Sequence, residues 1–191
     1  MKNFLLASTL TVATLFSGFT YAADYNIDRE GTHASINFKI KHLGYSWLTG
    51  RFNDFDGKFS YDQSTADASQ VNVVIQTASL DSNHAERDKH LKGEDFLDVS
   101  KYPTSTFTST NYTAIDENSG TLTGDFTLHG VTKTISFPIE KIGEGTDPWG
   151  GYRAGFSGKT TLKLTDYGID YNLGPASTHV ELELFIEGVR K

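Results

Sequence analysis

The sequence contains no cysteine among its 191 residues. Without a thiol the chain has no disulfide, no thiol nucleophile and no cysteine-ligated zinc site. A domain of this length buries a sufficient core without disulfides. Basic residues are also outnumbered, and the formal net charge is −7. Because phosphate backbones are bound by clustered Lys and Arg, and no basic stripe is present, we expect no binding to nucleic acid.

Recognisable catalytic motifs are also missing. The sequence has no glycine-rich phosphate loop and no dinucleotide-binding fingerprint. None of its six histidines lies in a recognisable triad motif, although the members of a triad need not be adjacent in sequence. We therefore expect no enzyme, and we assign no catalytic residue, cofactor or metal; a hydrolase acting on lipid-like substrates is the weaker alternative. The histidines are His33, His42, His84, His90, His129 and His179.

The first 22 residues have the pattern of a secretory signal peptide. Lys2 begins a short positive region, an apolar stretch covers Phe4 to Phe19, and Thr20–Ala22 places small residues before a cleavage point. We expect cleavage after Ala22, export to the periplasm and one domain over residues 23–191. The alternative is an uncleaved anchor, but polar residues interrupt the apolar stretch. No later segment resembles a transmembrane helix.

Most of the remaining chain alternates apolar and polar residues at a period of two, which is typical of half-buried strands. Ile36, Phe38 and Ile40 share one face of the first clear example. About eight such strands follow one another, and several exceed ten residues. Sheets of this size must stack or close. We predict an all-β fold, an antiparallel barrel of about eight strands, with a two-sheet sandwich as the alternative.

One densely charged segment, near residues 83–98, interrupts the strands as a short helical insertion. Ser82 or Asn83 is a suitable N-cap, and Glu86 occupies the capping-box position relative to Asn83. Gly93 supplies a stop signal. The sequence therefore predicts a helix that begins close to Asn83.

The charged side chains of this insertion have three interpretations. The simplest is helix capping and surface pairing. Metal binding is disfavoured, because His84 and His90 are six residues apart and diverge around a helix. In the third interpretation the helix covers a barrel mouth, where Arg87, Lys89 or His90 meets a polar or phosphate head group.

The inward faces inferred from alternation are large, aromatic and uncharged. Such side chains either meet and fill a small barrel or line a cavity for an apolar ligand. A filled barrel would suggest a structural or stress-response interaction protein. The candidate lining residues are Ile36, Phe38, Ile40, Phe59, Val73, Ile75, Phe107, Phe126, Phe137, Phe156, Leu162, Leu182, Leu184 and Ile186, with Trp47 at a possible rim.

Several motifs, in this order and spacing, resemble the YceI-like family. The resemblance covers the chain from about Asp24 to Lys191. The motifs that carry it are Asn83–Leu91, Asp95–Leu97, Lys101–Pro103, Phe107–Ser109, Leu122–Asp125, Leu128–Thr132 and Asp147–Gly150.

The resemblance implies a periplasmic, lipocalin-like antiparallel barrel whose interior holds a long apolar chain, typically a polyisoprenoid. Some family members occur beside membrane b-type cytochromes, which implies a link to quinone-like ligands and a transient cytochrome partner. The family has no established catalytic residues to transfer. With this resemblance, we expect a cavity rather than a filled core, in a monomer or a homodimer that carries or sequesters an isoprenoid or related lipid.

Overall fold

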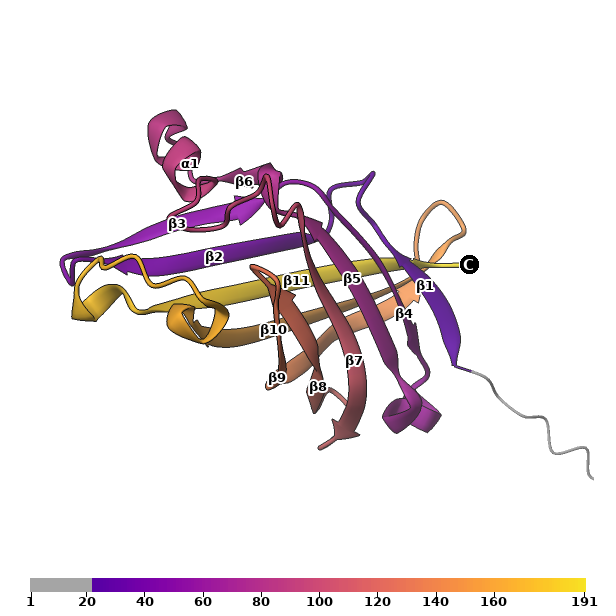
Figure 1. Ribbon diagram of the computed structural model, residues 1–191. Helices are drawn as coiled ribbons and strands as arrows, with labels where there is room; N and C mark the ends of the chain where they lie inside the picture. The colour runs from indigo at the N-terminus through magenta and orange to yellow at the C-terminus, as the bar shows by residue number, and fades with distance from the viewer. Residues whose placement is uncertain (1–21) are drawn as a thin grey trace, which may run out of the picture.

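The computed structural model describes residues 22–191 and consists mainly of antiparallel strands (Figure 1). The predicted signal peptide lies outside these described residues, apart from Ala22. Within residues 22–191, no helix is long and apolar enough to span a membrane. The strands are β1 (Ala23–Ile27), β2 (Ser35–His42), β3 (Ser46–Phe52), β4 (Phe55–Tyr61), β5 (Gln70–Gln76), β6 (Leu80–Asp81), β7 (Thr104–Ala114), β8 (Ser119–Leu128), β9 (Val131–Thr146), β10 (Tyr152–Lys163) and β11 (His179–Arg190).

Eight of these strands close into a barrel in the order β1-β4-β5-β7-β8-β9-β10-β11, with β1 returning to β11. The predicted all-β barrel is therefore confirmed, and the sandwich alternative is wrong. The remaining strands, β2, β3 and β6, continue the sheet from β11. This is possible because β11 is long enough for two partners: Val180–Phe185 pairs with β2, whereas Gly188–Arg190 pairs with β1.

The barrel has two ends, which we name by what they carry. The terminal end holds the start of β1 and the last residues of β11 (Figure 1). The helical end holds the β2–β3 turn, the β8–β9 turn and the segment that contains α1 (Ala85–Leu91). The 3₁₀ helices are η1 (Gln63–Ala68), η2 (Thr77–Ser79), η3 (Leu164–Tyr167) and η4 (Pro175–Ser177).

The helix α1 lies within the predicted insertion, but its cap differs from the expectation. His84 is the N-cap, and its Nδ1 accepts a hydrogen bond from Arg87 N at 3.2 Å. Asn83 has a left-handed backbone with φ of 62°, a conformation that asparagine tolerates. The Ser82 backbone N–H donates to Asp88 Oδ1 at 2.8 Å, so Ser82 is held by the helix rather than capping it. The cap therefore lies one residue beyond Asn83.

Candidate functional site

The barrel interior contains two apolar cavities arranged end to end. The terminal cavity has a volume of about 120 Å³, and the helical cavity has a volume of about 140 Å³. Four side chains line both cavities and form a waist between them: Ile36, Ile75, Phe126 and Leu182. No charged side chain lines either cavity. The apolar lining of both cavities suits an apolar ligand.

Every inward residue predicted from alternation lines one cavity or both, whereas Trp47 lines neither. Phe59, Val73, Phe107, Phe137, Phe156, Leu184 and Ile186 surround the terminal cavity, and Phe38, Ile40 and Leu162 surround the helical one. Trp47 lies on the outer face of β3 and is 48% exposed. The period of two explains this placement, because its neighbour Leu48 takes the inward position.

Alternation missed the lining residues that lie outside regular strands. The helical cavity is closed by Leu91, Phe96, Leu97, Ile169 and Leu173, which come from α1 and from loops. Loop residues have no periodic pattern, so alternation cannot detect them. The predicted helical insertion therefore does cover one end of the barrel, but mainly with leucine and phenylalanine.

Polar groups are few in the terminal cavity, and two of them are notable. Burial raises the pKa of Tyr112 above its ordinary value, so this phenol stays neutral. Ser69 Oγ is buried, and among the described side chains it is the one such polar atom without a hydrogen-bond partner. A buried hydroxyl without a partner carries a desolvation cost. Because the exposed wall of the terminal cavity is entirely apolar, this oxygen does not face the cavity space.

The barrel wall is incompletely paired between β9 and β10. Their ladder runs from Thr146 and Tyr152 to Ile139 and Gly158, and residues 131–138 have no partner on β10 among the described pairings. An outer groove shares Ile139, Ser157 and Gly158 with the terminal cavity at the last pair of the ladder. The terminal cavity therefore comes closest to this outer groove where the ladder stops.

The three residues predicted to meet a head group lie outside both cavities. Arg87 is held by Ser82, with Nε donating to Oγ at 2.8 Å and Nη2 donating to the backbone oxygen at 2.5 Å. Lys89 lies in a shallow surface depression. The ring of His90 packs edge-on against the ring of Phe96, which lines the helical cavity, with ring centroids 5.0 Å apart. Contact of any of the three residues with a head group stays a prediction.

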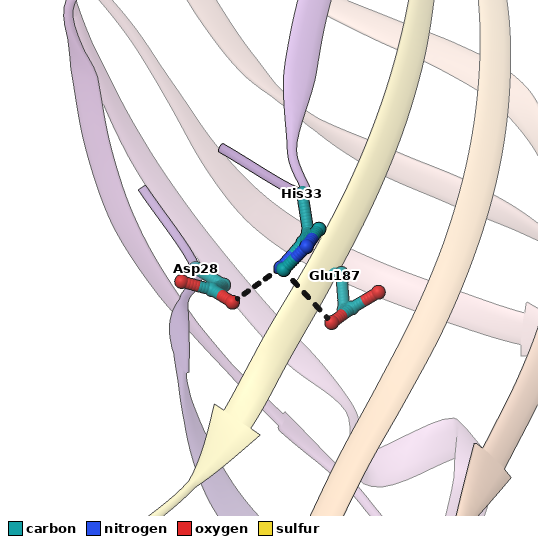
Figure 2. Close-up of side chains that lie close together, drawn as sticks. All are labelled: Asp28, His33 and Glu187. Atoms are coloured by element: carbon teal, nitrogen blue, oxygen red, sulfur yellow. Dashed lines mark hydrogen bonds and ion pairs between the residues drawn. The ribbon is translucent and has the colours of Figure 1, made fainter. Parts of the chain in front are cut away.

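A charged cluster lies outside the barrel at the junction of β1, β10 and β11 (Figure 2). His33 Nδ1 is 2.9 Å from Asp28 Oδ2 and 3.8 Å from Glu187 Oε1. Arg153 Nη1 contacts the same two oxygens at 2.5 and 2.6 Å, and its Nε contacts Asp147 Oδ2 at 2.8 Å. The guanidinium already occupies the Asp28 and Glu187 oxygens that a metal would need, so we assign the cluster to fastening β1 rather than to binding a metal.

Replacement of Asp28 with asparagine is expected to weaken the fold at neutral pH but not at pH 2. Hydrogen bonds from His33 and Arg153 lower the pKa of Asp28 from 3.8 to about 2. A lowered pKa adds stability above the unfolded-state value, and this stability is lost as the pH falls from about 4 to 2. After allowance for screening, we expect Asp28→Asn to lower the free energy of unfolding at neutral pH by about 1–2 kcal/mol. The measurement is urea unfolding of both proteins between pH 7 and pH 2.

Asp54 provides the matched control for this prediction. Its ion pair with Arg29 is exposed on both sides, with side chains 44% and 52% exposed. Substitution Asp54→Asn should therefore change the free energy of unfolding by less than about 1 kcal/mol. An Asp28→Asn deficit that persisted unchanged at pH 2 would contradict the assigned role of the ionised carboxylate.

Comparison with known proteins places this barrel in a family. The YceI-like domain matches residues 25–188. A protein of Ectopseudomonas mendocina named UPF0312 protein is 58% identical over the full length of both chains. The crystal structure of the Campylobacter jejuni YCEI protein is 29% identical, with a TM-score of 0.73 over 95% of this chain and 99% of that one.

A further solved structure shares the fold at lower identity. It is a polyisoprenoid-binding domain from Saccharophagus degradans implicated in plant cell wall breakdown. It is 19% identical, with a TM-score of 0.67 over 90% of this chain and all of that one. The matches cover almost the whole described barrel, and the chain belongs to the YceI-like family.

Proposed function

We propose that this protein binds a long apolar chain, of the isoprenoid or related lipid class, inside its barrel. The observation that carries the proposal is the pair of uncharged cavities inside the barrel, which share four lining residues. Each CH₂ group buried there contributes about 0.8 kcal/mol, so a long chain binds tightly without any hydrogen bond. The Saccharophagus domain of the same fold supports the isoprenoid class.

The proposed role is binding and carriage rather than catalysis. Two histidines of the described residues pair with carboxylates, His33 with Asp28 and Glu187, and His90 with Asp95, and both histidines lie outside the cavities. A general base must reach the group that it deprotonates, and neither histidine lines a cavity. A quinone is a further candidate ligand, and it rests on the family resemblance alone.

We propose the periplasm as the site of action, on the signal-peptide pattern of residues 1–22. Transport of a water-insoluble chain between membranes requires a soluble shell, and the barrel provides one. A transient link to a membrane b-type cytochrome remains part of this proposal and rests on family resemblance alone.

The proposal is tested by native mass spectrometry of the protein purified from its own cells, followed by organic extraction. We expect a stoichiometric adduct that releases a long apolar molecule. A bare mass that stays unchanged after incubation with polyprenyl lipids and quinones would contradict the proposal. The outcome would favour the alternative of an interaction protein whose own side chains fill the barrel.

A further inference from the structure

The β2–β3 turn at the helical end exposes three large apolar side chains. Leu43 is 51% exposed, Tyr45 is 87% exposed and Trp47 is 48% exposed. The same hairpin contributes Ile40 and Leu48 to the wall of the helical cavity. The tip of the hairpin therefore lies next to the helical cavity. Ile40 and Leu48 face the cavity, whereas Leu43, Tyr45 and Trp47 are exposed to water.

The conformation of Leu43 shows that the turn is not optimised for the fold alone. Leu43 and Gly44 have φ values of 51° and 85°, and Tyr45 N donates to His42 O at 2.9 Å across the turn. Asparagine or glycine normally occupies a turn position with positive φ. A leucine there is strained and also exposed, and strain of this kind concentrates at functional sites.

The charge of the hairpin is opposite to that of the chain. Residues 31–53 contain no Asp or Glu, although the whole chain has a formal net charge of −7. Lys39 is paired with Glu181 and Glu183, at 3.4 and 3.1 Å. Lys41 lies over the Trp47 ring, 5.5 Å from its centroid. The tip therefore combines aromatic, apolar and basic groups.

This combination distinguishes the tip from the other exposed tryptophan. Trp149 is 81% exposed in the β9–β10 turn at the terminal end. Its backbone N–H donates to Asp147 Oδ1 at 3.0 Å, and Glu140 and Glu144 lie on the preceding strand. Acidic residues outnumber the basic ones around this turn, where Arg153 and Lys141 are already paired with Asp147 and Glu144. An anionic surface would therefore not attract this turn, whereas it would attract the β2–β3 turn.

We propose that the β2–β3 turn docks the barrel on the surface of a bilayer that contains anionic lipids. Leu43, Tyr45 and Trp47 insert at the interface, where tyrosine and tryptophan are favoured, and Lys41 contacts lipid phosphates. Docking brings the helical end, where Leu91, Phe96 and Leu97 cover the helical cavity, against the bilayer that supplies or receives the apolar chain. The purpose of docking rests on the proposed ligand carriage, but docking itself requires no ligand.

The test is flotation of the chain from Ala23 onward, which contains every described strand, with phospholipid vesicles. The chain is used without residues 1–22, because their apolar stretch would bind vesicles by itself. We expect binding to vesicles of equal parts phosphatidylethanolamine and phosphatidylglycerol, weakened by salt, and little binding to pure phosphatidylcholine. Tyr45→Ser should reduce binding about tenfold, and Lys41→Gln about fivefold.

Leu43→Asn is the most informative variant. Asn-Gly is a preferred pair for this turn, so the unfolding midpoint should stay equal or rise, while vesicle binding falls about tenfold. Trp149→Ser is the matched control and should leave binding unchanged. In a Trp149→Phe background, Trp47 emission should shift to the blue when vesicles are added.

The docking proposal would be overturned if the protein did not float with phosphatidylglycerol vesicles, or if Leu43→Asn bound vesicles as well as the unmodified protein. It would also be overturned if Trp149→Ser lost as much vesicle binding as Leu43→Asn, or if the hairpin captured a protein and the chain bound no vesicles. A protein that carries a ligand adduct but does not float would refute docking and leave ligand carriage standing. A protein that floats but binds no polyprenyl lipid or quinone would refute ligand carriage and leave docking standing.

Discussion

Replacement of Leu182 with tryptophan is expected to abolish retention of a long apolar ligand while leaving the barrel folded. Leu182 is 9% exposed and belongs to the waist shared by both cavities. The larger ring would occupy the space through which the ligand passes. If about five CH₂ groups lose their place, about 4 kcal/mol of binding is lost, or roughly a thousandfold in affinity.

The cost to the fold should be much smaller than the cost to binding. Overpacking a core position typically destabilises a protein by about 1–3 kcal/mol, and the adjacent cavities give the ring space to adjust. The measurements are ligand stoichiometry by native mass spectrometry and the free energy of unfolding in urea. Phe185→Trp, on the outward face of the same strand, is the control and should bind normally. Normal stoichiometry in folded Leu182→Trp would mean that the ligand does not cross the waist.

Replacement of Phe126 with alanine should have the opposite profile, with a large loss of stability and retention of binding. Phe126 is 5% exposed, lines both cavities and packs edge-on against Tyr167, with ring centroids 5.8 Å apart. Removal of a buried phenylalanine costs about 3–5 kcal/mol, and here it merges the two cavities. We expect that loss for the ligand-free protein in urea unfolding.

Ligand should restore part of the stability lost by Phe126→Ala. A ligand at a hundred times its Kd adds about 3 kcal/mol to any protein that it binds only in the folded state. The merged cavity still accepts an apolar chain, so this gain should persist in the variant. Phe185→Ala, with a side chain 47% exposed, is the control and should change stability by about 0.5 kcal/mol or less. A loss of binding as complete as that of Leu182→Trp would contradict the expected profile.

Together the two substitutions separate the roles of the waist in binding and in packing. Leu182→Trp removes space and should mainly affect the ligand, whereas Phe126→Ala removes contacts and should mainly affect the fold. If the four waist residues only packed the core, both variants would change the free energy of unfolding. Neither variant would then change the ligand stoichiometry measured by native mass spectrometry.

The sequence alone determined which side chains face inward. In β2 and β11 the pleat places alternate residues on opposite faces, so Ile36, Phe38, Leu182 and Leu184 were correctly oriented without any tertiary information. The tight turn between β8 and β9 is also a local feature, because its two residues, His129 and Gly130, have φ values of 51° and 73°. These features depend on residues that are close together in the sequence, and they can therefore be predicted from it.

Only the tertiary structure decided whether the inward side chains meet or leave space between them. The gap depends on the barrel's radius and on the stagger of its strands, which arise from pairings between residues far apart in sequence. The same reason explains the cluster that joins Asp28 and His33 to Arg153 and Glu187, because pairing of β1 and β10 with β11 brings these residues together. Local periodicity determines which side chains of each strand point inward, whereas closure of the barrel determines how much space remains between them.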